Sequence, residues 1–141
     1  DFIVASEKAS LIEVFVNIGL VLDSGSSYFL PRLVGSARAF ELATLGSKVS
    51  AQQAFEWGMV NRVVPEEKLD EEVNAIATVY ANGPTKAYGL MKKMLNKSFH
   101  SDLDTMLEYE MYCQEIAGNS HDYKEGVHAF IEKRKANFKG I

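Results

Sequence analysis

The feature that most constrains the fold of this chain is a change of sequence pattern at Pro65. Before Pro65, short apolar runs alternate with short helical patterns that end at glycines, which is typical of α/β proteins. After Pro65, almost every segment repeats its apolar residues with the period of an amphipathic helix. The sequence therefore predicts an α/β part over residues 1–65 and a helical part over residues 66–141.

Within these parts, turn residues and hydrophobic spacing predict the individual elements. Strands are expected at residues 2–5, 11–16 and 60–64. Helices are expected at residues 24–30, 37–45, 51–57, 66–82, 85–99, 103–117 and 121–136. Pro31 is expected to disturb the first helix, and Ser36, Ser50 and Ser120 are expected to cap later ones.

Composition excludes several classes of function. The chain has 141 residues, 47% hydrophobic and 24% charged, with a net charge of −4 and no basic cluster of the kind that binds nucleic acid. No apolar run approaches the roughly 18 residues that span a bilayer. The single cysteine, Cys113, excludes an internal disulfide and fits a reducing compartment, so a cytoplasmic location is expected. The three histidines show no metal-ligand spacing, and no metal site is predicted.

Asp23 is the candidate catalytic residue. It is the only acidic residue between Glu13 and Glu41, and it lies where an apolar run is followed by a helical pattern. Two interpretations are open. An aspartate at this place is a good helix N-cap, and capping lowers a carboxylate's pKa. A general base working near neutral pH needs a raised pKa and hence an apolar pocket. The candidates for its walls are Val21, Leu22, Tyr28 and Phe29.

Other catalytic motifs do not fit this stretch. The serines around Gly25 do not form the G-x-S-x-G pattern of serine hydrolases. No phosphate-binding loop of the G-x-x-x-x-G-K-[ST] or G-x-G-x-x-G type is present.

A set of short segments occurs in a characteristic order and spacing over essentially the whole chain. They are Ala5-Ser6-Glu7-Lys8-Ala9, Asn17-Ile18-Gly19-Leu20-Val21, Leu30-Pro31-Arg32-Leu33-Val34-Gly35, Ser50-Ala51-Gln52-Gln53-Ala54, Trp57-Gly58-Met59-Val60-Asn61, Val63-Val64-Pro65 and 125–134. Together they resemble the crotonase (enoyl-CoA hydratase/isomerase) superfamily. The resemblance covers the C-terminal half of a family member. Within the family, the sequence is most similar to isomerases of the phenylacetate-degradation type.

The resemblance implies a fold and an assembly. Residues 1–65 are expected to be the C-terminal part of a spiral of ββα units, and residues 66–141 a helical trimerisation region that also contacts CoA. Members of the family assemble as trimers or dimers of trimers, so a homo-oligomer is expected. The family places its oxyanion-hole donors and its first hydratase glutamate ahead of the segment that matches Asp1. The first residues have the pattern of a strand without the residues that usually lead into one. The chain is therefore expected to be a fragment that is inactive alone.

The resemblance also assigns site residues. Hydratases have a glutamate at the position of Phe15, whereas isomerases and a related dehalogenase have an aspartate at the position of Asp23. Phe130 and Lys133 match positions that contact the adenine and phosphate end of CoA, and their spacing of three predicts one shared helix face. Leu22 departs from the proline usual in the family.

These implications lead to one main prediction and two alternatives. The main prediction is isomerisation of an enoyl-CoA double bond, with Asp23 moving the proton and with no metal or redox cofactor, since the CoA thioester is the substrate. The first alternative is an enoyl-CoA hydratase or lyase that uses a carboxylate from the other half of the fold. The second is a non-catalytic assembly fragment.

Overall fold

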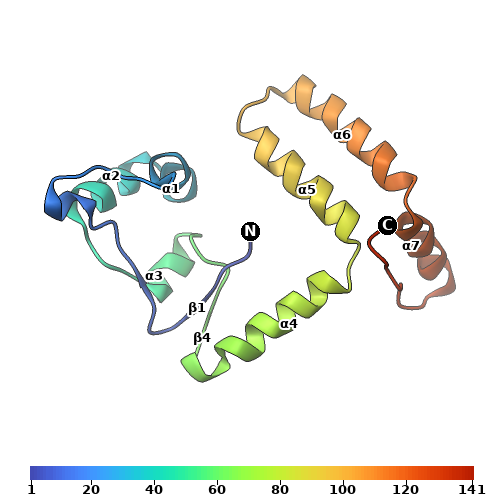
Figure 1. The fold of residues 1–141 in the computed structure, drawn as a ribbon, viewed down its shortest axis with the longest axis horizontal. Coiled ribbons are helices and arrows are strands. Elements are labelled where there is room, and N and C mark those ends of the chain that lie inside the picture. The colour runs from blue at the N-terminus through green and yellow to red at the C-terminus, as the bar shows by residue number, and fades with distance from the viewer. The chain divides into compact units, whose positions relative to one another are not determined.

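The computed structural model describes residues 1–141, which form two compact units, Asp1–Asn74 and Ala75–Ile141. Figure 1 shows the course of the chain through both. The strands all lie before Pro65, and helix α4 (Leu69–Ala81) crosses the boundary between the units. The assignment of residues 66–141 to oligomerisation and CoA contact stays a prediction.

Two short strand pairs hold the first unit together. Strand β1 (Val4–Ser6) pairs in parallel with β4 (Arg62–Val64), with Ala5 opposite Val63. Strand β2 (Ser10–Leu11) pairs antiparallel with β3 (Val49–Ser50). A parallel pair needs a long crossover connection, and the helices of this unit supply it.

The helical segments of the first unit before α4 are η1 (Phe15–Ile18), α1 (Ser26–Val34), α2 (Ser36–Leu45), α3 (Ala51–Glu56) and η2 (Glu66–Lys68). Of these, α1, α2 and α3 contribute to a core of aliphatic side chains. The buried core residues are Leu30, Val34, Ala39, Leu42, Val49, Ala54 and Val60. Since α1 packs on α2 and contributes Leu30 and Val34, the segment that follows Asp23 is anchored in this core.

Three expectations for the first unit are wrong in detail. The expected strand at 11–16 ends at Leu11, and the chain turns into the 3-10 helix η1, because only Ser10 and Leu11 find a partner strand. Helix α1 continues through Pro31 to Val34, since a proline within a helix removes one hydrogen bond and the burial of Leu30 and Val34 on either side of it still favours the helix. Ser36 lies inside α2, whose N-cap position is taken by Gly35.

The predicted cap of α3 is confirmed. The Ser50 hydroxyl accepts a hydrogen bond from the Gln53 backbone N–H at 3.2 Å, and the Gln53 side chain accepts one from the Ser50 N–H at 3.1 Å. This reciprocal pair is a capping box, which satisfies two backbone donors at the start of the helix.

The second unit is helical. After the end of α4 come α5 (Thr85–Ser98), α6 (Leu103–Gly118) and α7 (His121–Glu132). Helices α5 and α6 lie side by side in opposite directions (Figure 1), and α6 also packs on α7. The Asp102 carboxylate caps α6 by accepting the Thr105 N–H at 2.8 Å, and this hydrogen bond lowers the Asp102 pKa. Cys113, the single cysteine, is buried in α6.

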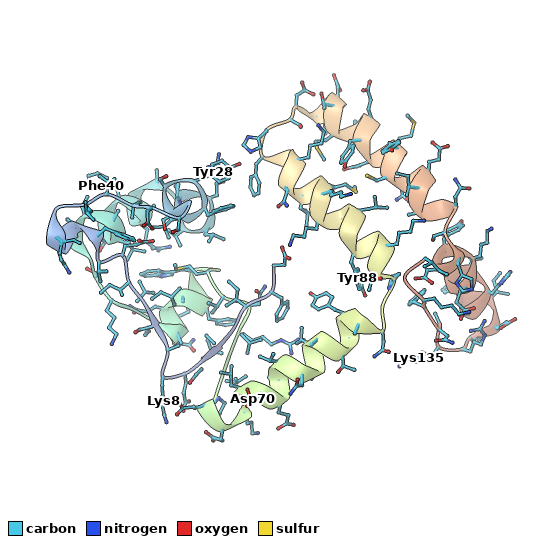
Figure 2. The ribbon with its side chains drawn as sticks, viewed as in Figure 1. Lys8, Tyr28, Phe40, Asp70, Tyr88 and Lys135 are labelled. Carbon is cyan, nitrogen blue, oxygen red and sulfur yellow. The ribbon has the colours of Figure 1, made fainter.

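Each unit carries large apolar side chains on its surface. In the first unit they include Ile18, Val21 and Phe40, and in the second Leu95, Met111 and Phe130. Figure 2 shows the side chains on all elements, with Phe40 labelled on α2. Exposed apolar surface of this extent is typical of faces that other protein segments or ligands cover.

Candidate functional site

Asp23 lies in a tight turn that leads directly into α1. Its backbone carbonyl accepts the Ser26 N–H at 2.8 Å. The two residues between them have positive φ angles, 51° at Ser24 and 86° at Gly25, with a ψ of 4° at Gly25. These values are those of a type I′ turn, in which glycine is the preferred second central residue. The turn therefore fixes the backbone on which the Asp23 carboxylate stands.

The capping interpretation of Asp23 is wrong. Gly25 occupies the N-cap position of α1, and no side chain caps the helix. The physical reason is the turn itself, which brings the Asp23 carbonyl, and not its carboxylate, to the first free N–H group. The carboxylate is exposed to solvent and is therefore free to meet a ligand.

Aromatic side chains of α1 support this turn. A Cβ atom at Gly25 would lie 3.1 Å from Cε2 of Phe29, so the Phe29 ring packs directly on the glycine. The Phe29 ring meets the Tyr28 ring edge to face, with centroids 5.1 Å apart. The Arg32 guanidinium lies over the Tyr28 ring, 3.6 Å from its centroid. Glycine at position 25 is thus required twice, by the backbone angle and by the close aromatic contact.

The apolar walls expected around Asp23 do not close over it within this chain. Val21 is 84% exposed and Phe29 is 56% exposed. Phe15, at the position where hydratases have a glutamate, lies half-buried in η1. The first unit therefore supplies an open apolar surface beside a carboxylate, and it offers no second carboxylate at position 15.

Phe130 and Lys133 lie in the second unit, at the end of α7. Phe130 is 86% exposed. The expectation that both residues share a helix face is wrong, because α7 ends at Glu132 and not at 136. Lys133 has φ 55° and ψ 38°, a left-handed conformation that ends the helix. The helix stops here because the residues after it bond to α7 from outside.

Phe130 also forms part of the wall of an apolar pocket with a volume of about 380 Å³. Pro84, Lys86 and Ala87 line it from the start of α5, and Phe138 lines it from the C-terminal residues. Tyr123 and Val127 of α7 complete the apolar stripe that contains Phe130. The exposed Phe130 ring thus lies on the wall of an apolar hollow.

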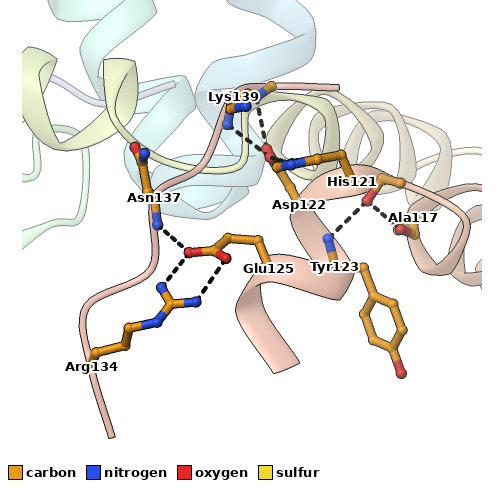
Figure 3. A network of polar contacts seen from close by, with 10 residues as sticks. Ala117, His121, Asp122, Tyr123, Glu125, Arg134, Asn137 and Lys139 are labelled. Atoms are coloured by element: carbon orange, nitrogen blue, oxygen red, sulfur yellow. Dashed lines mark hydrogen bonds and ion pairs between the residues drawn. The ribbon is translucent and has the colours of Figure 1, made fainter. Parts of the chain in front are cut away.

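Two carboxylates of α7, Asp122 and Glu125, hold the residues that follow Lys133 (Figure 3). Burial raises the pKa of Asp122, but hydrogen bonds from the Lys139 and Gly140 N–H groups and from His121 outweigh it, so the pKa is lowered. The hydrogen bond from Arg134, followed by one from the Asn137 N–H, lowers the pKa of Glu125 from 4.5 to about 2. Both groups are therefore charged at neutral pH.

Sequence reasoning missed these two carboxylates. On a helix they read as part of a solvated face, and their partners lie up to 18 positions further along the chain. The available signal was the tail itself, since Asn137 and Gly140 are poor helix formers and lie where a helix was expected to have just ended.

Two further observations concern other kinds of site. No group of three or more His, Cys, Asp or Glu side chains in residues 1–141 is placed to hold a metal ion. None of the helices is both long enough and apolar enough to cross a membrane.

The arrangement of the chain is that of a crotonase fold. A putative enoyl-CoA hydratase/isomerase from Mycobacterium abscessus, known from its crystal structure, superimposes with a TM-score of 0.96 at 36% sequence identity, over 100% of this chain and 54% of that one. The Enoyl-CoA hydratase/isomerase family model matches residues 1–141. The chain therefore belongs to the enoyl-CoA hydratase/isomerase family.

Two curated relatives bear on the kind of activity. The 1,2-epoxyphenylacetyl-CoA isomerase of Escherichia coli K12 is 42% identical over 99% of this chain and 53% of its own length. A probable enoyl-CoA hydratase of Rhodobacter capsulatus is 35% identical over 99% of this chain and 54% of its own length. The chain spans about half the length of these relatives, and it resembles members named for either reaction.

Proposed function

We propose that the protein containing this chain isomerises the double bond of an enoyl-CoA and that Asp23 carries the proton. The observation that carries the proposal is the free Asp23 carboxylate, held on a fixed turn beside apolar surface. Because it caps no helix, its charge is available for proton transfer. The half-buried Phe15 at the hydratase glutamate position adds support, because its ring cannot transfer a proton.

The proton balance of this reaction is simple. The Asp23 carboxylate removes a proton from C2 of a 3-enoyl thioester, and the electron pair delocalises into a dienolate with its charge on the thioester oxygen. The protonated Asp23 then returns the proton to C4, which leaves the 2-enoyl thioester and restores the carboxylate. Backbone N–H donors at the thioester oxygen stabilise the dienolate, and we place those donors outside residues 1–141, as the family resemblance implies.

Phe130 and Lys133 belong to the same proposal as contacts for CoA. An exposed aromatic ring beside an apolar pocket offers a stacking surface for adenine. The exposed ammonium of Lys133 suits a phosphate as a point charge. Asp23 and these two residues lie in different compact units.

The test is a product analysis with the protein as isolated from its source, supplied separately with 3-enoyl-CoA and 2-enoyl-CoA. The proposal predicts interconversion of the two enoyl-CoA isomers, and loss of this activity in Asp23→Asn. Formation of 3-hydroxyacyl-CoA at a rate that Asp23→Asn leaves unchanged would favour the second candidate, a hydratase, which the hydratase-named relative supports. Binding of neither substrate would favour the assembly role.

A further inference from the structure

The segment after α7, which we call the C-terminal strap (residues 134–141), folds back along that helix. The Asp122 carboxylate, only 3% exposed, accepts the N–H groups of Lys139 and Gly140, each at 2.8 Å. The Asp122 N–H donates in turn to the Ile141 carbonyl at 3.2 Å. One end of the strap is thus fastened to the first turn of α7.

A second fastening lies next to Lys133. The Arg134 guanidinium donates to both oxygens of Glu125, at 2.6 and 3.0 Å, and to Glu132 at 2.6 Å. Glu125 also accepts the Asn137 N–H at 2.8 Å (Figure 3). A bidentate pair of this kind fixes direction as well as distance, so Arg134 is held in one orientation immediately after Lys133.

Lys133 itself has a backbone conformation that glycine usually takes. The Lys133 N–H bonds to the Phe130 carbonyl at 3.3 Å, and the Arg134 N–H to the Ala129 carbonyl at 3.0 Å. A helix that ends with these hydrogen bonds has a left-handed residue directly after its last helical residue, and glycine adopts that conformation at the lowest cost in free energy. A lysine with a φ of 55° therefore needs the strap to hold it there.

The strap also separates the roles of neighbouring cations. Arg134 is neutralised by Glu125 and Glu132. Within residues 1–141, the Lys133 ammonium is exposed and makes no ion pair. Without Glu125, Arg134 would keep only its pair with Glu132, and the strap would lose the bidentate contact next to the left-handed Lys133.

We propose that Glu125 and Asp122 are positioning residues, which through the strap hold Lys133 so that its ammonium meets the 3′-phosphate of the CoA substrate. The proposal rests on the proposed function, because it takes Lys133 to be a CoA contact. It adds that this contact depends on two carboxylates that do not touch the substrate. The strap therefore acts on the phosphate end of the substrate and not on the chemistry at the thioester.

The test compares the affinity of the isolated protein for CoA and for 3′-dephospho-CoA by titration calorimetry. The ratio of the two dissociation constants reports the phosphate contact, and a general loss of folding does not change it selectively. We expect Lys133→Gly to reduce the ratio by on the order of tenfold, since hydrogen bonds between charged groups are the strong ones. The same variant should fold at least as well as the wild type, because glycine suits this backbone angle.

Glu125→Gln should reduce the ratio roughly threefold, within the range of partly exposed ion pairs, and Arg134→Gln should do the same. Glu125→Asp, which keeps the charge, should restore part of the preference. Lys135→Ala is the matched control, because it removes a cation two positions from Lys133 without changing the left-handed residue, and it should leave the ratio unchanged.

The outcomes distinguish the positioning role of Glu125 from the CoA contact of Lys133. If Lys133→Gly lowers the ratio and both Glu125→Gln and Arg134→Gln leave it at the wild-type value, the positioning role is overturned while the CoA contact stands. If Lys133→Gly leaves the ratio unchanged, or the wild type shows no preference for CoA, the CoA contact itself is overturned and the positioning role with it.

Discussion

Asp23 and Asp122 are two aspartates beside the start of a helix, and the structure uses them in opposite ways. Asp23 precedes α1, is exposed and caps nothing. Asp122 lies in the first turn of α7, is buried and binds two backbone N–H groups of the strap. The place of a carboxylate along a helix therefore does not decide its role. What decides it is whether backbone donors from elsewhere in the chain reach it.

The largest effect expected from this contrast is on catalysis. Asp23→Asn should lower kcat by about 10²–10⁴-fold, the usual contribution of a general base, and should leave the free energy of unfolding nearly unchanged because the side chain is exposed. Steady-state kinetics and denaturant unfolding of the same variant measure the two quantities. Glu41→Gln, another exposed carboxylate of the first unit, is the control and should change neither.

The next effect concerns the turn that carries Asp23. Gly25→Ala should lower the free energy of unfolding by about 1–2 kcal/mol from backbone strain alone, and by more because the new methyl group would press on Phe29. Gly19→Ala is the matched control, since Gly19 has a φ of 73° but nothing within 4 Å of an added Cβ. Equal losses in the two variants would mean that Phe29 does not support the turn.

A smaller effect separates a serine that caps a helix from one that does not. The Ser120 hydroxyl accepts the Tyr123 N–H at 3.0 Å, and Ser120→Ala should lower the free energy of unfolding by about 1 kcal/mol. Ser36 lies inside α2 without capping it, so Ser36→Ala should lower the free energy of unfolding by about a few tenths of a kcal/mol at most. Thermal or denaturant unfolding of both variants measures the difference, and a larger loss for Ser36→Ala would contradict the start of α2 at Ser36.

The effect confined to the fewest residues is the pH dependence of the strap. The pKa of Glu125 is lowered from 4.5 to about 2, and that of Asp122 is also lowered. A depressed pKa in the folded state gives stability that is present above the unfolded value and lost as the pH falls through the folded value.

Hydrogen exchange of the Asn137, Lys139 and Gly140 amides should therefore stay protected at pH 5. Protection of the Asn137 amide, which binds Glu125, should fall progressively as the pH drops from about 4.5 towards 2. Protection of the Lys139 and Gly140 amides should fall as Asp122 is protonated, which its lowered pKa places below the ordinary range of an aspartate. Amides of α5, whose hydrogen bonds do not involve these carboxylates, are the internal reference. Protection of the strap amides that is constant across this range would contradict their attachment to Asp122 and Glu125.

Much of the fold could be predicted from local sequence signals. The Gly83-Pro84 break precedes the start of α5, and Gly118-Asn119-Ser120 marks the end of α6 and the start of α7. The structure confirms these three boundaries to within a residue. These signals work because a helix end depends on residues that are close in sequence.

Most of the errors share a physical cause, which is contact between residues far apart in sequence. Residues 133–136 have good helical propensity, yet α7 ends at Glu132 because its own carboxylates bind the strap. The strand expected at 11–16 lacks a partner beyond Leu11. Asp23 is a different case, because the Ser24-Gly25 turn that frees its carboxylate is local, and a Ser-Gly pair is a general signal for a turn.

The most direct test of the central claim measures proton transfer at the carbon atoms of the substrate. The isolated protein is incubated with a 3-enoyl-CoA in deuterium oxide, and NMR records deuterium at C2 and C4. Because the Asp23 carboxyl is exposed and can exchange its proton with the solvent between removal and return, we predict that the wild type incorporates deuterium at both positions and that Asp23→Asn incorporates it at least about 10²-fold more slowly. Incorporation by Asp23→Asn at the wild-type rate would show that another group moves the proton and would contradict the role of Asp23 as the proton carrier.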